Sequence, residues 1–414
     1  MRVLHAATHE HTGAGRAAAR IHAALRASGV DSELLVLYGD AADPGTEVLG
    51  DPVRRRVATL HRRLEEGLLG LQRSGDDAYR SLGLGGAPGL ARIRAKRPDI
   101  VHLHWIPGLL GIADLPQLPA PAVWTLHDAW PICGAEHYAG AARPREGYTA
   151  ANRPPGSGGL DLDRWTWERK RAHWRGFDPL LVCTSRWMAD EVRASALFRG
   201  RPVRVIPNPL DTALYRPLDR AAARSRLGLP PGRPLLLFSA WRATEDRRKG
   251  FAVLAEALRL LGARGLAGTF DLVVAGAAGT QPVHGFATHW REGSADEARM
   301  RDLYSACEMI AIPSLSDNSP NTLAEAMACG AAVAGSDAGG IPDLLRHGET
   351  GLVAARGDAA QLAERLAALA GDAGLRARLA EAGRRAVESA CAPAVVAAQY
   401  ADAYRDALAG KTAR

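Results

Sequence analysis

The sequence predicts an α/β protein with two parallel β-sheets, each in a domain of its own. Short runs of β-branched residues alternate with longer helical patterns, which is typical of parallel strands joined by crossover helices. Pro and Gly punctuate the segment from Pro207 to Gly232 and divide this alternation into two series. The 414 residues suffice for two domains with full cores. We therefore expect Rossmann-like domains over 1–207 and 208–390, and a terminal helix within 391–414.

Each expected strand is a short apolar run, and each expected helix carries apolar residues at helical spacing. In the first series we expect strands over 3–7, 31–37, 100–104, 122–126, 180–184 and 203–206, and helices over 16–28 and 186–195. In the second series we expect strands over 234–239, 270–275, 309–313 and 332–335, and helices over 250–262, 296–306, 323–329 and 360–370. Residues 392–408 have the pattern of an amphipathic helix, and residues 140–159 that of a long loop.

The composition is that of an ordinary globular protein, with 47% hydrophobic and 23% charged residues. No apolar run approaches the ~20 residues of a membrane span, and Met1 leads directly into a strand instead of a signal peptide. The five cysteines are far apart and lack metal-ligand spacing, so we expect reduced thiols in the cytoplasm and no metal site. A net charge of +7 permits anionic ligands, but no nucleic-acid-binding motif accompanies it.

The most informative segment contains two acids eight positions apart, Asp317 and Glu325. Between them lies the polar turn Asn318-Ser319-Pro320-Asn321, followed by a helix start at Thr322. Backbone N–H groups at a helix start suit phosphate, and carboxylates suit sugar and ribose hydroxyls. This combination predicts a nucleotide-sugar site. The alternative is a helix cap, in which Asn321 or Thr322 caps the helix and Glu325 offsets its dipole.

Two other segments lie where a strand gives way to a helix. Gly13-Ala14-Gly15 follows the first strand and would let a diphosphate or sugar approach the backbone, although an ordinary strand-to-helix turn has the same pattern. Arg248 and Lys249 follow the first strand of the second series, where cations would neutralise a diphosphate. The alternative there is a solvated basic loop.

His127 follows the strand expected over 122–126, so its side chain is expected at the strand end. It could hydrogen-bond a sugar hydroxyl or assist proton transfer. The alternative is a structural histidine held by Asp128. His102 and His104 alternate on an earlier strand, where a histidine can also be merely packed.

An apolar stripe at helical spacing follows the second expected strand, with arginines on its flanks. The apolar positions are Val53, Val57, Leu60, Leu64, Leu68 and Leu71, and the arginines are Arg54, Arg55, Arg56, Arg62 and Arg63. Such a helix could touch an anionic membrane or a lipid-linked acceptor. The alternative is a surface helix with a solvated polar face.

Together these segments resemble the retaining glycosyltransferases of family 4, which have the GT-B architecture. The resemblance covers nearly the whole chain and rests on the order and spacing of several motifs. They are Gly13 to Gly15, Asp-Ile-Val-His-Leu-His-Trp from Asp99, Trp-Thr-Leu-His-Asp from Trp124, Val-Ile-Pro-Asn from Val205, Arg-Lys-Gly from Arg248, the acid pair, and Gly-Glu-Thr-Gly from Gly348. The chain looks most like members used in exopolysaccharide or surface-glycan assembly.

The resemblance implies two Rossmann-like domains that face a central cleft, with the C-terminal helix crossing back to the first, acceptor-binding domain. The second domain would bind the nucleotide-sugar, with Arg248 and Lys249 on the phosphates and Glu325 on the ribose hydroxyls. Asp317 and the residues after it would hold the transferred sugar. His127 and the glycine loop would complete the donor site from the first domain.

The chain departs from the family pattern at three places. The first acid of the pair is Asp317, one methylene shorter than the usual glutamate. The position of the usual arginine falls near Ala243 or Thr244, so that Arg242 or Arg247 would serve the diphosphate. Cys133 stands alone in a loop where some relatives carry several cysteines, so no metal is expected there.

The sequence thus predicts a cytoplasmic, metal-independent enzyme that transfers a sugar from a nucleoside-diphosphate-sugar to a hydroxyl acceptor with retention of configuration. The donor is a substrate, and no cofactor is expected. The acceptor would be a glycan, a lipid-linked glycan or a small molecule, and contact with the inner face of a membrane is left open. Two alternatives remain, namely a nucleotide-sugar epimerase of GT-B fold and a catalytically silent nucleotide-sugar-binding subunit.

Overall fold

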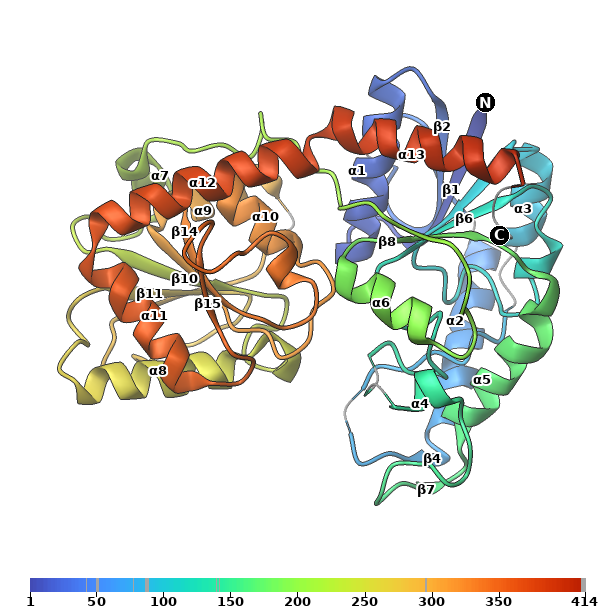
Figure 1. Cartoon of the computed structure of the whole chain (residues 1–414), viewed down its shortest axis with the longest axis horizontal. Helices are drawn as coiled ribbons and strands as arrows, with labels where there is room; N and C mark the ends of the chain where they lie inside the picture. Colours follow the sequence, from blue (N-terminus) through green and yellow to red (C-terminus); the bar gives the residue numbers. More distant parts are fainter. Residues whose placement is uncertain are drawn as a thin grey trace. The chain divides into compact units, whose positions relative to one another are not determined.

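The computed structural model describes residues 1–41, 43–49, 52–76, 78–85, 89–138, 140, 142–294 and 296–410, with 52–55 described by their backbone alone. The chain forms two compact units (Figure 1). Unit 1 comprises Met1–Pro209 and Pro393–Arg414, and unit 2 comprises Leu210–Ala392. Each unit contains a parallel sheet with helices packed on it, as the alternation of strand and helix patterns predicts.

Unit 1 is built on a parallel sheet with the strand order β3-β2-β1-β5-β6-β8-β9. Its strands are β1 (Arg2–His9), β2 (Asp31–Tyr38), β3 (Thr46–Val48), β5 (Ile100–Leu103), β6 (Ala122–Leu126), β8 (Leu180–Cys183) and β9 (Val203–Val205). Its helices are α1 (Gly13–Ala27), α2 (Pro52–Leu69), α3 (Gly89–Lys96), α4 (Ala142–Glu146), α5 (Leu162–His173), α6 (Arg186–Ala194) and α13 (Pro393–Leu408), with single turns η1 (Leu115–Gln117) and η2 (Trp174–Gly176). A separate antiparallel pair joins β4 (Gln72–Arg73) to β7 (Gly158–Gly159).

Unit 2 is built on a parallel sheet with the strand order β12-β11-β10-β13-β14-β15. Its strands are β10 (Leu235–Ser239), β11 (Asp271–Ala275), β12 (Thr288–Arg291), β13 (Met309–Ile312), β14 (Ala332–Ser336) and β15 (Leu352–Ala354). Its helices are α7 (Arg220–Leu227), α8 (Phe251–Ala263), α9 (Glu297–Ala306), α10 (Asn321–Ala328), α11 (Ala359–Gly371) and α12 (Ala373–Cys391), with turns η3 (Arg247–Lys249) and η4 (Ile341–Asp343).

Each sheet contains a switch point where the strand order reverses direction. This point lies between β1 and β5 in unit 1, and between β10 and β13 in unit 2. Ligands of open α/β sheets bind beyond the carboxyl ends of the strands at such points, because the connections there leave to opposite sides. The loops that follow these strands are therefore the first places to look for a site in each unit.

The last helix is part of the core of unit 1. Val396, Tyr400 and Tyr404 of α13 are fully buried in one cluster with Val3 of β1 and Ile100 of β5. In Figure 1, α13 runs beside α1, and the two helices are in contact. The burial of these side chains attaches the chain end to the first sheet, because it removes large aromatic groups from water.

The structure differs from the sequence prediction at a few element boundaries. Helix α1 begins at Gly13 and not at 16, because the hydroxyl of Thr12 caps it by accepting a hydrogen bond from the Gly15 amide at 3.3 Å. The sequence prediction also misses several whole elements, which are β3, α3, α5, α7, β12, β15 and α12. The loop expected over 140–159 contains α4 and ends in β7. No helix among the described residues is both long and apolar enough to cross a bilayer.

Candidate active site

The loops after β10 and β13 bring a cation and an acid together at the switch point of unit 2. Nζ of Lys249 donates a hydrogen bond to Oδ2 of Asp317 at 2.6 Å. The Asp317 side chain is 10% exposed and that of Lys249 is 26% exposed, so water screens this ion pair only in part. The structure thus joins two of the predicted site residues in direct contact.

Backbone contacts set the position of Lys249 against the loop that carries Asp317. Gly250 has a φ of +77°, and a Cβ there would lie 1.9 Å from the carbonyl oxygen of Pro313. The amide of Leu315 donates to the carbonyl oxygen of Arg248 at 2.7 Å. Only a glycine allows this close approach, and for that reason Gly250 follows the lysine.

A hollow opens beside the ion pair. Its lining residues are Phe238, Ser239, Ala240, Lys249, Tyr304, Ile310, Ala311, Ile312, Ser314, Asp317 and Thr322. The lining includes residues of two neighbouring strands, β10 and β13, and the polar side chains of Lys249, Asp317 and Thr322. Its space of about 10 Å³ is roughly that of one water molecule, so the hollow marks where polar side chains meet the strand ends.

Glu325 lies beneath this hollow. The Glu325 residue is 2% exposed. Among the described residues, it does not belong to the lining of the hollow. Its Oε2 accepts a hydrogen bond from the hydroxyl of Tyr304 at 2.9 Å, and Tyr304 does line the hollow. Sequence reasoning misses Tyr304, because nothing in the helix pattern of α9 distinguishes this tyrosine from a core residue.

Helix α10 starts without a side-chain cap in the described structure. Its N-cap is Pro320, so neither Asn321 nor Thr322 caps it, and that alternative is wrong. Proline holds the φ that a helix start needs but has no side-chain acceptor, and the carbonyl oxygen of Pro320 accepts a hydrogen bond from the amide of Leu323 at 3.0 Å.

The other predicted cations of unit 2 are placed differently. The guanidinium of Arg248 donates to Oδ2 of Asp246 at 2.7 Å. Arg242 has a φ of +51° and pairs with Glu245 at 2.7 Å, while Arg247 is exposed. Within the described structure of unit 2, Lys249 is the predicted cation that lines the hollow.

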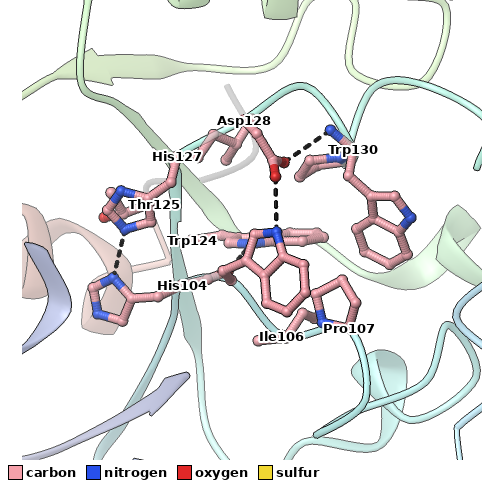
Figure 2. Close-up of a pocket in the computed structure, with 11 residues that line it drawn as sticks. His104, Ile106, Pro107, Trp124, Thr125, His127, Asp128 and Trp130 are labelled. Carbon is pink, nitrogen blue, oxygen red and sulfur yellow. Dashed lines mark hydrogen bonds between the residues drawn. The ribbon is translucent and has the colours of Figure 1, made fainter. Parts of the chain in front are cut away.

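In unit 1, a small pocket lies at the end of β6 (Figure 2). Figure 2 shows His127 beside His104, and the distance between His127 Nε2 and His104 Nδ1 is 3.0 Å. Asp128 accepts hydrogen bonds from the backbone amide of Trp130 at 3.0 Å and from Trp105 Nε1 at 2.8 Å. It also pairs with His137 at 2.6 Å. Among the described contacts, His127 is therefore hydrogen-bonded to His104, and the Asp128 side chain is bonded to other residues.

Burial keeps these histidines neutral. It lowers the pKa of His127 to about 4, although Asp128 opposes this shift, and it lowers the pKa of His104 well below the ordinary value. At neutral pH both rings are uncharged. His127 can therefore take part in hydrogen bonds at the strand end, but it supplies no positive charge there.

His102 and His104 are both buried, so each of them packs in the core. His102 bonds the hydroxyls of Tyr404 at 2.8 Å and Thr125 at 2.7 Å. His5, His102 and His104 each place one ring nitrogen within 4.8 Å of the others, a spacing from which a metal could be bound after rearrangement. Glu10, His11 and Asp40 form a second, more exposed group of this kind.

The predicted glycine loop of unit 1 is the first turn of α1, at the end of β1. A Cβ on Gly15 would lie 2.0 Å from the carbonyl oxygen of His9, so this glycine lets the helix pack on the strand. Gly13 has nothing within 4 Å of its Cβ position. Gly13 and Ala14 are therefore the part of this turn that a ligand could approach.

Two family models match the chain, and they fall on the two units. "Glycosyltransferase Family 4" matches residues 11–214, and "Glycosyl transferases group 1" matches residues 233–372. Among solved structures, sucrose-phosphate synthase from Thermosynechococcus elongatus is similar with a TM-score of 0.69 at 19% identity, covering 99% of this chain and 100% of that one. HepE of Anabaena in complex with UDP-glucose has a TM-score of 0.67 at 16% identity, covering 98% and 100%. The two family models define the chain as a glycosyltransferase, and the two parallel sheets and the solved structures show the GT-B fold.

The particular family follows from the models and from sequence relatives. A D-inositol 3-phosphate glycosyltransferase of Acidothermus cellulolyticus is 29% identical over 298 residues, which cover 68% of this chain and 61% of that protein. An alpha-maltose-1-phosphate synthase of Mycobacterium tuberculosis is 27% identical over 339 residues, which cover 76% and 81%. The chain belongs to glycosyltransferase family 4, as its motifs predict. The match spans less than two thirds of the first relative's length.

Proposed function

We propose that this glycosyltransferase moves a sugar from a nucleoside-diphosphate-sugar to a hydroxyl acceptor with retention of configuration. The single observation that carries the proposal is the Lys249–Asp317 pair at the switch point of the unit 2 sheet, at 2.6 Å. An ammonium suits the diphosphate, and the neighbouring carboxylate suits the hydroxyls of the sugar attached to it. The UDP-glucose of the HepE complex is a ligand of this chemistry.

Each residue of the site has a role in this proposal. Lys249, with Arg248 beside it, binds the phosphates, and Asp317 binds the transferred sugar. Glu325 binds the ribose hydroxyls, and Tyr304 orients its carboxylate. The backbone of Asn318–Thr322 and the first turn of α10 support the phosphates, because amides at a helix start favour negative charge. Within unit 1, the residues that we propose for donor binding are His127 and the Gly13–Gly15 turn.

Catalysis in this proposal is mainly electrostatic. The ammonium of Lys249 and the start of α10 stabilise the diphosphate as it leaves, when negative charge grows on its oxygens. The site orients the acceptor hydroxyl against the anomeric carbon, and this positioning lowers the entropic part of the barrier. The proposed reaction uses no metal and no cofactor.

The experiment compares Lys249→Ala and Glu325→Ala with a matched pair on the surface of the same unit, Arg259→Ala and Glu256→Ala. Arg259 and Glu256 pair at 2.7 Å on α8 and lie outside the hollow. The readouts are thermal stabilisation by a panel of UDP-, GDP-, ADP- and CMP-sugars, and release of nucleotide from the one that binds. We expect both site variants to lose stabilisation and turnover while the surface pair keeps them.

Three outcomes would replace the proposal. Unchanged binding and turnover in both site variants would move the donor site elsewhere. An epimerised nucleotide-sugar as the product would make the protein an epimerase. Tight nucleotide-sugar binding without turnover, across a panel of glycan and small-molecule acceptors, would make it a silent binding subunit.

We further propose that the protein works in the cytoplasm, in polysaccharide or glycoconjugate synthesis, and that α2 touches the inner face of a membrane. Val57, Leu60 and Leu64 share one side of α2 and are 38%, 66% and 55% exposed. Along one edge of this row, Glu65 accepts a hydrogen bond from the amide of Leu84 at 2.9 Å and His61 bonds the carbonyl of Gly85, so this edge of the helix is held to unit 1.

Exposed arginines border this apolar row and match an anionic lipid surface. Arg56 and Arg63 lie on the same side of the helix as the row and are exposed. The side chains of Val53, Arg54 and Arg55 lie outside the described residues. We expect the protein to float with phosphatidylglycerol vesicles and a Leu60→Gln/Leu64→Gln variant to remain below them. Equal flotation of both proteins would exclude α2 as the contact.

A further inference from the structure

A pocket of unit 1 lies at the opposite edge of the sheet from the predicted site residues of that unit. Its volume is about 350 Å³. Its lining includes Arg175, Asp178, Arg199, Gly200 and Arg201. These residues precede β8 and β9, which are neighbouring parallel strands, whereas His127 and the Gly13–Gly15 turn follow their strands. The pocket is therefore at the amino ends of the strands, and we call it the arginine pocket.

Three arginines and one acid give the arginine pocket its charge. Arg201 pairs with Asp178, and Nη2 of Arg199 donates to the backbone carbonyl oxygen of Arg145 at 3.0 Å. Among the described residues, no acid pairs with Arg175 or Arg199. Guanidiniums stay protonated at neutral pH. The three cations and the one anion of the lining therefore leave a net charge of +2 in the pocket.

A tight turn before β9 brings two of these arginines into the same pocket. Gly200 stands between Arg199 and Arg201 and has a φ of +81°, which favours glycine. The amide of Arg201 donates to the carbonyl oxygen of Phe198 at 3.0 Å and closes the turn. In the described structure, the space within 4 Å of the Cβ position of Gly200 is open. A ligand can therefore approach the backbone between the two guanidiniums.

Burial makes this gathering of cations unfavourable without an anion. The Arg201 side chain is 26% exposed, and burial lowers the pKa of its guanidinium. Asp178 offsets one positive charge, and the other two repel each other. Solvated arginines can spread over a surface, whereas these three line one hollow. A bound anion would remove the repulsion.

The charge and the volume together select the class of anion. A phosphate monoester carries about −1.5 to −2 charges at pH 7 and matches the charge of the pocket. Its oxygens accept several hydrogen bonds at once, and guanidiniums bind them in a bidentate way. A volume of about 350 Å³ is near the lower end of the range for ligand pockets, which suits a group of the size of a monosaccharide.

We infer that the arginine pocket is a second binding site of this protein and that it takes a phosphate monoester between Arg175, Arg199 and Arg201. It shares no residue with the candidate active site. Two sources have this chemistry, namely a phosphorylated sugar in solution and the headgroup of phosphatidic acid in a membrane. The inference does not depend on the proposed function, because it uses no residue of the proposed donor site.

The first experiment measures the binding of glucose 6-phosphate to the full chain by titration calorimetry at low salt. Arg175→Gln/Arg199→Gln is the pocket variant. Arg171→Gln/Arg193→Gln is the matched control, because both arginines are exposed, lie outside the pocket and carry the same charge. We expect the affinity to fall by about tenfold or more in the pocket variant and by less than about twofold in the control. Equal losses in the two would reveal a general attraction to a basic protein and overturn the inference.

Glucose 6-phosphate could also bind at Lys249, the cation that we propose for the diphosphate. Lys249→Ala tests this, and we expect it to retain the wild-type affinity for glucose 6-phosphate. Loss of binding in Lys249→Ala, with normal binding in the pocket variant, would place the phosphate in the donor site and overturn the inference. Loss of nucleotide-sugar binding in Lys249→Ala concerns the proposed function alone.

Vesicle flotation distinguishes the two sources of the phosphate. Phosphatidylcholine vesicles with and without phosphatidic acid are compared in the Leu60→Gln/Leu64→Gln background, so that the apolar row of α2 does not contribute. Flotation that needs phosphatidic acid and is lost with the pocket substitutions assigns the lipid source. Binding of glucose 6-phosphate without such flotation assigns the soluble source. Binding of neither one overturns the inference.

Chemical modification of the wild-type chain gives a result even if the pocket variant does not fold. Phenylglyoxal modifies accessible arginines, and mass spectrometry of the peptides identifies the modified positions. We expect glucose 6-phosphate or phosphatidic acid vesicles to protect Arg175 and Arg199 and to leave Arg171 unprotected. Equal modification of Arg175 and Arg199 with and without both ligands would overturn the inference.

Discussion

A Cβ atom on Gly339 would lie 1.8 Å from the carbonyl oxygen of Asp317. Gly339 has a φ of +55°, and the next amide, that of Gly340, donates to the same oxygen at 3.1 Å. The turn after β14 therefore supports the backbone that carries the proposed sugar-binding acid. Because backbone contacts tolerate little displacement, Asp317 is held at a defined place before any ligand arrives.

Gly339→Ala should impair the donor site, because the added methyl group pushes the Asp317 backbone away. The positive φ and the clash together cost about 1–3 kcal/mol. We expect the affinity for the donor to fall by about tenfold or more, which is about 1.4 kcal/mol or more. Gly228→Ala is the matched control, since Gly228 has a φ of +60° and open space at its Cβ position. Titration calorimetry measures the donor affinity. Equal affinities in the two variants would show that Gly339 does not hold the Asp317 backbone in place.

Tyr304→Phe should weaken donor binding more than it weakens the fold. The hydroxyl donates to buried Glu325 at 2.9 Å, and its loss leaves a buried carboxylate with one partner fewer, at a cost of about 1–3 kcal/mol. Urea unfolding and nucleotide titration of Tyr304→Phe, Glu325→Gln and the double variant form a cycle. We expect a coupling energy above about 0.5 kcal/mol. Strict additivity would show that Tyr304 does not orient Glu325.

Lys170→Met should destabilise unit 1. The ammonium is fully buried and donates to the carbonyl oxygens of Trp130, Cys133 and Gly134, and it lies 3.8 Å from the centre of the Trp130 ring. Methionine fills the space but removes the hydrogen bonds that the ammonium donates to these carbonyl oxygens, of which that of Trp130 also accepts from the amide of Cys133 at 3.3 Å. We expect a loss of about 2 kcal/mol or more in the free energy of unfolding. Arg171→Met, on the same helix and exposed, should change it by less than about 0.5 kcal/mol. Similar losses in both would contradict the role of Lys170.

Stability should fall on acidification from about pH 6.5 toward pH 4. The folded-state pKa values of His5, His102 and His104 are lowered well below the ordinary value, and that of His127 is lowered to about 4. In this window the unfolded chain binds more protons, so each histidine contributes up to about 1.4 kcal/mol per pH unit. Glu136 acts in the opposite direction, because burial raises its pKa to about 7.

Urea unfolding across this pH range measures the effect. His102→Gln should reduce the pH slope, whereas His173→Gln, on the exposed end of α5, should reduce it far less. A flat stability profile between pH 6.5 and pH 4 would mean that the unfolded and folded chains bind protons alike. In that case these histidines would not be neutral in the folded core.

Local pattern alone predicts most of the sheet and the loops of the site. The run Ala122–Leu126 is a strand at the expected residues, since a strand buried on both faces is a continuous apolar run. Lys249 and Asp317 can each be placed on a strand-end loop from the sequence. Parallel strands bring their carboxyl ends to one edge of the sheet, so the strand pattern alone favours a shared site for the two.

The contacts that define the site depend on the tertiary structure. Lys249 and Asp317 are 68 residues apart, and their contact follows from the pairing of β10 with β13, which no local pattern specifies. The bond between Tyr304 and Glu325 and the bond between His104 and His127 arise in the same way, from helices and strands joined by long crossovers. The sequence by itself determined the family, the two parallel sheets and the residue types of the site. Only the tertiary structure decided that Glu325 lies under Tyr304 and that His127 is held by His104, because both depend on which buried side chains become neighbours when the sheets form.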